Sequence, residues 1–384
     1  MESVAESRTA DIRPAAGSHR HLLIGLITVL LCLGVQMVLS ASFSSRPGDR
    51  EAIFLGRHLM WLTVSIAAAW LASRIPAEQL RAWCPAAFWL LLLLLVAVLT
   101  PGIGSRINGA QRWLRFAGFS LQPSELGRII LPMLAVDRLL KQQEQGRAGI
   151  RGIPQILLPL LLALPLVAAE PDLGATVFLT IGYLLALFFG GWPIRCFLVC
   201  CTALLPGTGL LLLLKPYQLK RISGFLETWQ DISSAPWQVR QSLYSLGTGG
   251  LEGTGVGGGW QKLSYLPEAN TDFVFAVIGE ELGLLGTLTV CLVWLFVYRC
   301  GISVLNATSQ RSFRWITGTT LLTQLALQAM ANIAVVTALV PPKGVPHPFI
   351  SYGGTNLLVS LVAIGLILGP AEQHTSSTDI QSNR

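Results

Sequence analysis

The feature that most constrains the fold of this chain is a series of apolar runs, each long enough to cross a lipid bilayer. A helix needs about 20 apolar residues to span the hydrocarbon core. Only 12% of the 384 residues are charged and 52% are apolar, which excludes an ordinary soluble globular domain. We therefore expect an all-α polytopic membrane protein with about ten transmembrane helices, at residues 20–42, 51–73, 82–101, 122–140, 153–169, 172–190, 194–214, 272–299, 313–340 and 350–370.

The positions of the positive charges predict how the chain is inserted. An even number of spans puts both termini on one side, and basic residues are frequent in the N-terminal stretch and in RLLKQQEQGRAGIR after the fourth span. The positive-inside rule makes that side cytoplasmic. We expect cytoplasmic tails at 1–19 and 372–384, one membrane domain at 20–371, and a large extracytoplasmic loop at 215–271 between spans seven and eight.

The short outer loop GIGSRINGAQRWLRFAGF carries Arg106, Arg112 and Arg115, although the same rule predicts few cations there. Long translocated segments escape the rule, which accounts for Lys262 in loop 215–271 but not for this short loop. Because Arg offers paired donors to phosphate oxygens, an anionic partner at the outer surface is one interpretation. Charge placement without a function is the alternative.

The motif QPSELGR opens the fourth predicted span and carries Glu125 and Arg128. Side chains three residues apart share a helix face and can pair. One interpretation is a structural ion pair that lets Arg128 enter the bilayer. The other is a polar wall of an outward-facing cavity, formed together with Arg112 and Arg115 of the preceding loop.

The motif EPDLG joins the fifth and sixth predicted spans with almost no loop between them. Both of its carboxylates, Glu170 and Asp172, are therefore expected at the outer surface. We expect Asp172 to cap the sixth span and Glu170 to be solvated. A role at the rim of a cavity is the weaker alternative for this pair.

The segment LPEANTDFVF places Asp272 at the start of the eighth predicted span. Thr271 or Asp272 would ordinarily be assigned as a helix cap. Charged neighbours argue for more, because Lys262 and Glu268 precede Asp272 and further carboxylates follow about 12 Å deeper on the helix, at Glu280 and Glu281. A carboxylate held at the water boundary is a candidate general base.

Two further outer segments are rich in Gly or Pro. GTGGLEGTGVGGG contains the spacing of a dinucleotide-binding loop, but no strand precedes it, so a flexible or tightly turning loop is the better interpretation. PPKGVPHPFISYGGTN contributes Lys343, and its prolines stiffen the approach to the last span. A broken or re-entrant helix start and an ordinary turn both fit this second segment.

Four segments together resemble the SEDS proteins, the enzymes of bacterial shape, elongation, division and sporulation. They are NGAQRWLRFAGFSLQPSELGR, EPDLGAT, LPEANTDFVFAVIGEELGLLG and PFISYGGTN, in the order and on the spans typical of the family. The resemblance runs from about residue 20 to 370. KLSYLPEANTDFVFAVIGEELG is more similar to the cell-division and sporulation members than to the elongation members. Two departures are Asn270, where His is usual, and Thr355 with Asn356 in place of a Ser pair.

The resemblance implies a peptidoglycan glycosyltransferase that polymerises lipid II into glycan strands at the outer face of the cytoplasmic membrane. The essential Asp of the family falls on Asp272 and its motif Glu on Glu125. Its basic cavity residues match Arg112, Arg115, Lys262 and Lys343, and we add Arg128 and Glu268 as candidate substrate-binding neighbours from their positions. No resident metal site is expected, although a divalent cation, Mg²⁺ or Mn²⁺, fits the chemistry of a pyrophosphate leaving group.

The resemblance also implies partners and a location. A class B penicillin-binding protein, the transpeptidase that crosslinks the strands, is the expected partner, together with other membrane proteins of the division complex and no nucleic acid. The expected site is the cytoplasmic membrane, at the septum. Three alternatives stay open: a flippase or transporter for lipid II, a non-catalytic scaffold, and a polymerase for elongation. A transporter would distribute ionisable groups through the full membrane depth, whereas here they gather in the outer half.

Overall fold

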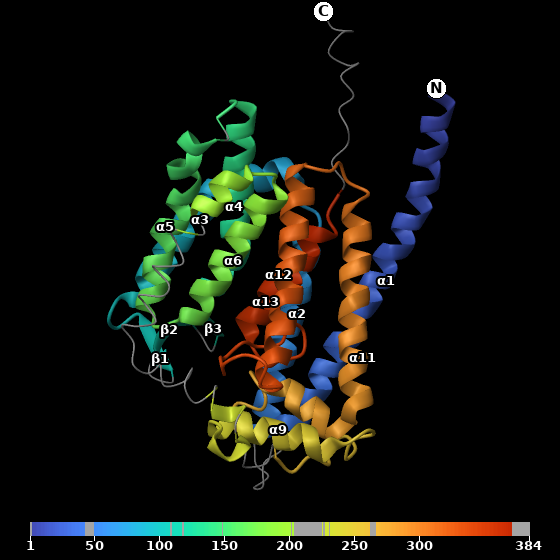
Figure 1. Cartoon of the computed structure of the whole chain (residues 1–384), viewed down its shortest axis with the longest axis vertical. Helices are drawn as coiled ribbons and strands as arrows, with labels where there is room; N and C mark the ends of the chain where they lie inside the picture. Colours follow the sequence, from blue (N-terminus) through green and yellow to red (C-terminus); the bar gives the residue numbers. More distant parts are fainter. Residues whose placement is uncertain are drawn as a thin grey trace, which may run out of the picture.

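The computed structural model describes residues 2–42, 50–107, 110–116, 119–147, 149–200, 231–261 and 266–370, with residues 202, 225 and 227–229. Long helices dominate these parts of the chain (Figure 1). The elements are α1 (Glu2–Ser42), α2 (Arg50–Ala72), α3 (Ala77–Leu99), β1 (Gly104–Ile107), β2 (Ala110–Phe116), β3 (Phe119–Leu121), α4 (Pro123–Glu144), η1 (Ile150–Gly152), α5 (Ile153–Ala169), α6 (Leu173–Phe189), η2 (Ile232–Ser234), α9 (Trp237–Gly249), α11 (Val274–Leu305), α12 (Phe313–Val336) and α13 (Gly354–Ile367).

Helices lie at the described positions of the predicted spans, although a break at Gly283, where φ is 65°, divides α11 and with it the predicted span 272–299. Only some of the helices are long and apolar enough to cross a membrane by those two criteria alone. Among the described residues, 6 helices meet both criteria. Helices α6 and α13 are apolar but shorter, and α4 is more polar. Residues 194–200 are helical, and the rest of the predicted span 194–214, apart from residue 202, lies outside the described residues. The chain is therefore a mostly helical, multi-pass membrane protein, and ten spans remain a prediction.

The prediction of an all-α fold is wrong for one short segment. The three strands form an antiparallel sheet in the order β1-β2-β3, in which Gly104 pairs with Leu114, and Arg115 with Ser120. Side chains alternate between faces along a strand, so Leu114 is buried while its neighbour Arg115 is exposed. The segment is short and its charges interrupt the apolar pattern, which is why it was predicted as a loop.

Local chemistry explains where several helices begin. Pro123 occupies the first turn of α4, where its missing N–H leaves no partner unsatisfied. Asp172 caps α6 by accepting a hydrogen bond of 2.9 Å from the main-chain nitrogen of Ala175, which confirms the predicted cap. Ser312 caps α12 in the same way.

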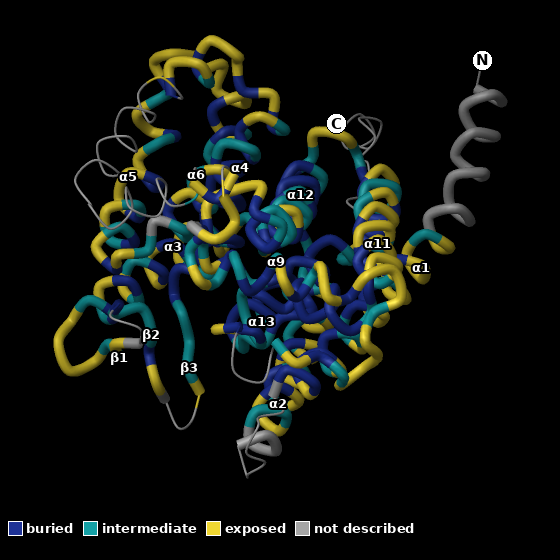
Figure 2. The backbone as a smooth tube through the Cα atoms, turned by 60° about the horizontal axis from the view of Figure 1, so that its bottom comes forward, coloured by how far each residue is buried: buried dark blue, intermediate teal, exposed yellow. Residues whose placement is uncertain are grey.

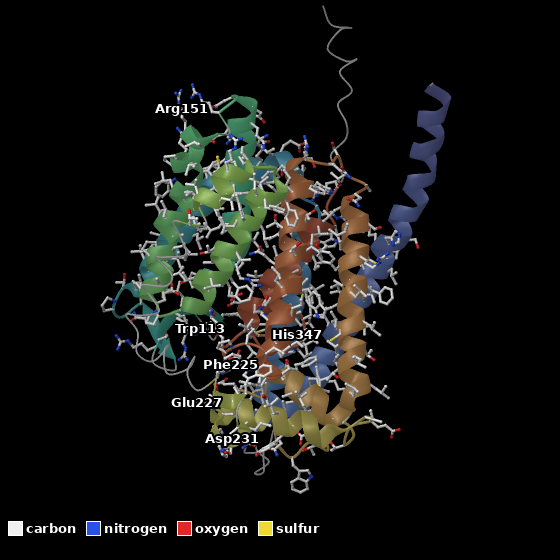
Figure 3. The ribbon with its side chains drawn as sticks, viewed as in Figure 1. Trp113, Arg151, Phe225, Glu227, Asp231 and His347 are labelled. Carbon is white, nitrogen blue, oxygen red and sulfur yellow. The ribbon has the colours of Figure 1, made fainter. Side chains whose placement is uncertain are left out.

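Helices α12 and α13 occupy the interior of the bundle, and much of α1, α3 and α5 faces outward (Figure 2). The start of α1 and the end of α13 lie at one end of the molecule, and β1–β3 with α9 lie at the other, which we call the loop end (Figure 1). Figure 3 places Trp113 and Asp231 at the loop end and Arg151 at the opposite end.

The glycine-rich segment turns tightly and packs against α11 at the loop end. The Glu280 carboxylate accepts hydrogen bonds from the main-chain nitrogens of Trp260, at 2.6 Å, and Gln261, at 3.0 Å. Gly253 has a φ of 83°, and a Cβ there would collide with the main chain of α11. Glu280, one of the carboxylates that follow Asp272 in the sequence, thus binds the main chain at the end of the glycine-rich segment.

Candidate active site

Asp272 lies in a run of turns at residues 266–273, immediately before α11. The expectation that Thr271 or Asp272 caps this helix is wrong, because the residue at the cap position is Phe273 and no side chain caps α11. The hydroxyl of Thr271 instead donates to the carboxylate of Glu268, at 3.1 Å. A main-chain turn replaces the cap, in which the nitrogen of Asp272 donates to the carbonyl oxygen of Glu268 at 3.1 Å.

The carboxylate of Asp272 lies against residues 341–353, the stretch that connects α12 to α13. A Cβ at Gly344 would come within 2.7 Å of Asp272 Oδ2, so only a glycine fits there without a shift. The main-chain nitrogen of Tyr352 donates to the carbonyl oxygen of Asn270, at 2.8 Å. These contacts place the candidate base directly beside the main chain that carries Lys343.

Two candidate cations meet at Asp172. Arg112, on β2, pairs with the Asp172 carboxylate at 3.3 Å, and its Nη2 donates to the carbonyl oxygen of Pro171 at 2.8 Å. Lys343 reaches the same helix start, because its Cε lies 3.2 Å from where a Cβ of Gly174 would be. Burial lowers the pKa of Lys343, and the charge of Asp172 opposes that shift. The structure thus brings together two residues that the sequence places far apart.

Glu125 and Arg128 belong to a buried network on the inner side of this cluster. Arg128 Nη1 donates to Glu125 Oε2 at 2.7 Å and to Asn356 Oδ1 at 3.1 Å, and Nη2 donates to Gln328. Arg128 is only 6% exposed, so protein groups take up most of its donors. The arrangement favours the ion-pair interpretation for Arg128 over an open polar wall.

The remaining predicted site residues are Arg115, Glu268 and Lys262. Arg115 is exposed on β2, where strand alternation directs it to the face opposite Arg112. Glu268 is exposed and forms the turn before Asp272. Lys262 lies outside the described residues.

Glu170 is buried, contrary to the expectation that it is solvated. Its side chain is 0% exposed, and neither carboxylate oxygen has a hydrogen-bond partner among the described residues. Burial, and after it the charge of Asp172, raises the pKa of Glu170 to about 8, while Arg112 opposes the shift. Glu170 is therefore mostly neutral at pH 7 and does not add a negative charge beside the two cations. The sequence could not show this, because the burial depends on how Arg112 folds over the α5–α6 connection.

Sequence reasoning missed the amide side chains that tie the site together. Gln122 Nε2 donates to Asp172 Oδ2 at 3.3 Å. On α12, Gln328 and Asn332 donate to main-chain oxygens of the 341–353 stretch. The available signal was a row of amides four residues apart on one apolar span, Gln324, Gln328 and Asn332.

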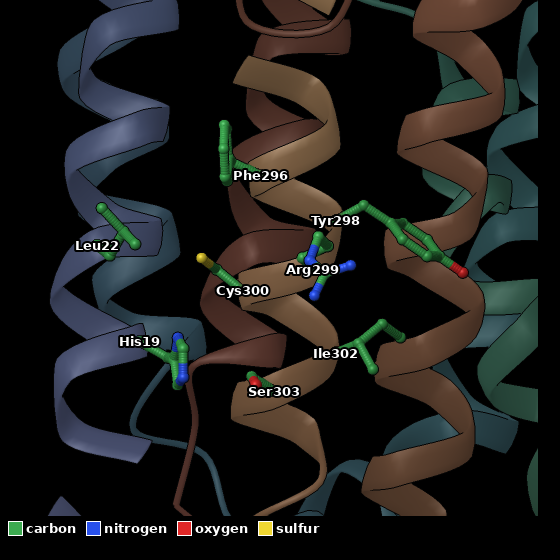
Figure 4. Close-up of a pocket in the computed structure, with 8 residues that line it drawn as sticks. All are labelled: His19, Leu22, Phe296, Tyr298, Arg299, Cys300, Ile302 and Ser303. Atoms are coloured by element: carbon green, nitrogen blue, oxygen red, sulfur yellow. The ribbon is translucent and has the colours of Figure 1, made fainter. Parts of the chain in front are cut away.

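A cavity of about 500 Å³ lies far from this chemistry, between α1 and α11 (Figure 4). Its lining is mostly apolar, with His19 and Arg299 as the basic groups. Figure 4 shows His19 on α1 and Arg299 on α11. The Asp272 carboxylate, the cations Arg112 and Lys343 and the turns at residues 266–273 lie at the loop end, so we place the candidate active site there. Among the described residues, no three His, Cys, Asp or Glu side chains group as metal ligands.

Comparisons with known proteins agree on one family. The model of the cell cycle proteins FtsW, RodA and SpoVE matches residues 20–376. A probable peptidoglycan glycosyltransferase FtsW of Trichlorobacter lovleyi is 37% identical over 349 residues, which cover 90% of this chain and 91% of the relative. The protein of the same name in Coxiella burnetii is 39% identical over 353 residues, covering 88% and 92%.

Solved structures show the same fold. A chain from a peptidoglycan synthase complex, described as coordinating polymerization and crosslinking, matches with a TM-score of 0.72 at 25% identity, covering 90% of this chain and 95% of that one. The crystal structure of the rod shape determining protein RodA of Thermus thermophilus matches with a TM-score of 0.62 at 23% identity, covering 90% and 94%.

Proposed function

This chain belongs to the family of the cell cycle proteins FtsW, RodA and SpoVE, and from that premise we infer that it is a peptidoglycan glycosyltransferase of cell division. Its relatives of that name match nearly the whole chain. We propose lipid II as the substrate. The observation that carries this proposal is the placement of the Asp272 carboxylate against Gly344, one residue from Lys343, which meets Arg112 at Asp172. A carboxylate beside the main chain of Lys343, whose side chain meets Arg112, suits a sugar hydroxyl and a pyrophosphate.

In the proposed reaction, Asp272 accepts the proton of the 4-hydroxyl of the acceptor GlcNAc as that oxygen attacks C1 of the donor MurNAc. The bond between C1 and the phosphate oxygen breaks, and undecaprenyl pyrophosphate leaves with the bonding electrons. Arg112 and Lys343 stabilise the charge that develops on this leaving group. Arg115 and Lys262 are assigned to the approach of the same anionic substrate, and Mg²⁺ or Mn²⁺ would add positive charge at the pyrophosphate.

We propose that the loop end faces the outside of the cytoplasmic membrane, with ten spans and both termini in the cytoplasm. The support is that the start of α1 and the end of α13 lie opposite the candidate site (Figure 1). The match to a chain of a peptidoglycan synthase complex supports a transpeptidase partner of the class B penicillin-binding type, and the names of the relatives support a place at the septum.

The decisive test uses the purified full chain in detergent with labelled lipid II and no other enzyme. The expected result is a ladder of glycan strands that lysozyme digests. Proteoliposomes with fluorescent lipid II in one leaflet measure the alternative activity, which is transport of lipid II to the other leaflet. If lipid II crosses the bilayer and no polymer forms, the transporter alternative holds. If neither transport nor polymer is detected, even when the transpeptidase is added, the scaffold alternative holds.

Asp172 both caps α6 and pairs with Arg112, and two substitutions separate these roles. Asn caps helices about as well as Asp, so Asp172→Asn should leave the thermal unfolding midpoint nearly unchanged. It should raise the KM for lipid II about tenfold, because Arg112 loses the ion pair that orients it. Asp172→Ala should show the same rise in KM and also lose about 1 kcal/mol of stability. Equal KM values for Asp172→Asn and wild type would show that the pair does not orient Arg112.

A further inference from the structure

Asn332, on α12, joins the two irregular segments that form the candidate active site. Its single amide nitrogen donates to the carbonyl oxygen of Asp272 and to that of Val345, both at 2.7 Å. The side chain is 0% exposed, so water does not compete for these bonds. One side chain therefore sets the spacing between the main chain of the candidate base and the main chain that carries Lys343 and Gly344.

The segment 341–353, to which Asn332 donates, cannot form the regular main-chain hydrogen bonds of a helix or strand. Residues 341–353 contain four prolines without a main-chain N–H, Pro341, Pro342, Pro346 and Pro348, and adopt neither helix nor strand. Buried carbonyl oxygens in such a segment need donors from elsewhere. Helix α12 supplies them one turn apart, since Gln328 Nε2 donates to the carbonyl oxygen of Pro346 at 2.7 Å, next to the bond from Asn332.

The geometry points to Asn332 as a positioning residue for the proposed transferase reaction, an inference that rests on the proposed function. Its hydrogen bonds fix the main chain of Asp272 against the main chain of residues 341–353 and thereby set where the Asp272 carboxylate lies. Asn332 itself carries no charge. These two hydrogen bonds require a nitrogen with two N–H donors on a side chain as short as that of Asn. Asp lacks the second donor, Leu lacks both, and Gln is one methylene longer.

The test compares Asn332→Leu with Gln324→Leu, a matched control two turns earlier on the same face of α12. Gln324 is also buried, and neither of its amide atoms has a hydrogen-bond partner among the described residues. Both substitutions remove an amide of the same helix and leave an apolar side chain. We expect kcat for lipid II polymerisation to fall about a hundredfold for Asn332→Leu, the effect of misplacing a reacting group by about 1 Å. For Gln324→Leu we expect kcat to stay within about twofold.

The kcat values of the two variants decide the question. A fall in kcat for Asn332→Leu with a KM within about threefold, at an unfolding midpoint close to that of Gln324→Leu, supports positioning. Equal kcat values for the two variants overturn it. If Asn332→Leu does not fold, the comparison moves to Asn332→Asp. A wild-type protein that makes no polymer under any condition rejects the proposed function itself, which distinguishes that failure from this one.

Asn332→Asp gives a readout that packing alone would not produce. The new carboxyl can donate one hydrogen bond when it is protonated, whereas its ionised form repels the two carbonyl oxygens that Asn332 joins. The activity of Asn332→Asp relative to wild type should therefore rise as pH is lowered. A ratio that stays constant from pH 5 to 8 would overturn the role of the two donors.

Discussion

Replacing Asp272 by Asn should reduce lipid II polymerisation by about 10²–10⁴-fold, the usual contribution of a general base. Asn has the same size but cannot accept a proton at neutral pH. The protein should fold normally, because Asn keeps the size of the side chain and leaves unchanged the main-chain hydrogen bonds of residue 272 with Glu268 and with Asn332. Binding of lipid II should persist, because the cations Arg112 and Lys343 are unchanged.

The measurement is the initial rate of glycan formation by purified protein, with lipid II binding measured on the same preparation. Glu252→Gln is the matched control, since Glu252 is an exposed carboxylate in the loop that precedes Asp272. We expect wild-type rates for it. If Asp272→Asn polymerises as fast as this control, Asp272 is not the base, and the reaction must use another group.

The second large effect is expected on stability. Glu125→Leu removes the carboxylate that pairs with Arg128 at 2.7 Å, at a site where the two side chains are 14% and 8% exposed. Removing one partner of a buried pair leaves an uncompensated charge and costs about 3–5 kcal/mol. Arg128 keeps bonds to Asn356 and Gln328, but both are neutral amides. The unfolding midpoint in detergent should therefore drop sharply.

Glu144→Gln provides the comparison for this effect. Glu144 pairs with Arg81 at 3.0 Å, but its side chain is 63% exposed, and solvated pairs contribute about 0–1 kcal/mol. Its midpoint should stay close to that of wild type. Should Glu125→Leu unfold at the same temperature as Glu144→Gln, water reaches Arg128 more freely than its burial indicates.

The transmembrane helices were predictable from the sequence because their signal is local. A run such as 153–169 is apolar except for Gln155, and the structure places α5 at the same residues. The cap at Asp172 was also predictable, because capping involves neighbours within one turn. The β1–β3 sheet was missed because each strand is short and its pairing depends on segments that the sequence shows only as a charged loop.

The candidate site was predictable in its residue types but not in its geometry. Charges at the ends of spans and the resemblance of four motifs selected Asp272, Arg112 and Lys343. Nothing in the sequence indicated that Arg112 and Lys343 would meet at Asp172, or that Glu170 would be buried beside them. The resemblance assigns the roles expected in the family to positions of this chain, whereas the burial and pairing of their side chains follow from how the helices pack.

The sequence by itself determined that this chain enters a membrane, and it predicted on which side the chemistry takes place and which carboxylate stands at the boundary. These properties depend on hydropathy, charge and short motifs, which are written residue by residue. Only the tertiary structure decided that Asn332 joins the two segments around Asp272, and that Arg128 stays inside the bundle. The physical reason is that a hydrogen bond acts over about 3 Å, so its partners are known only once distant helices have been brought together.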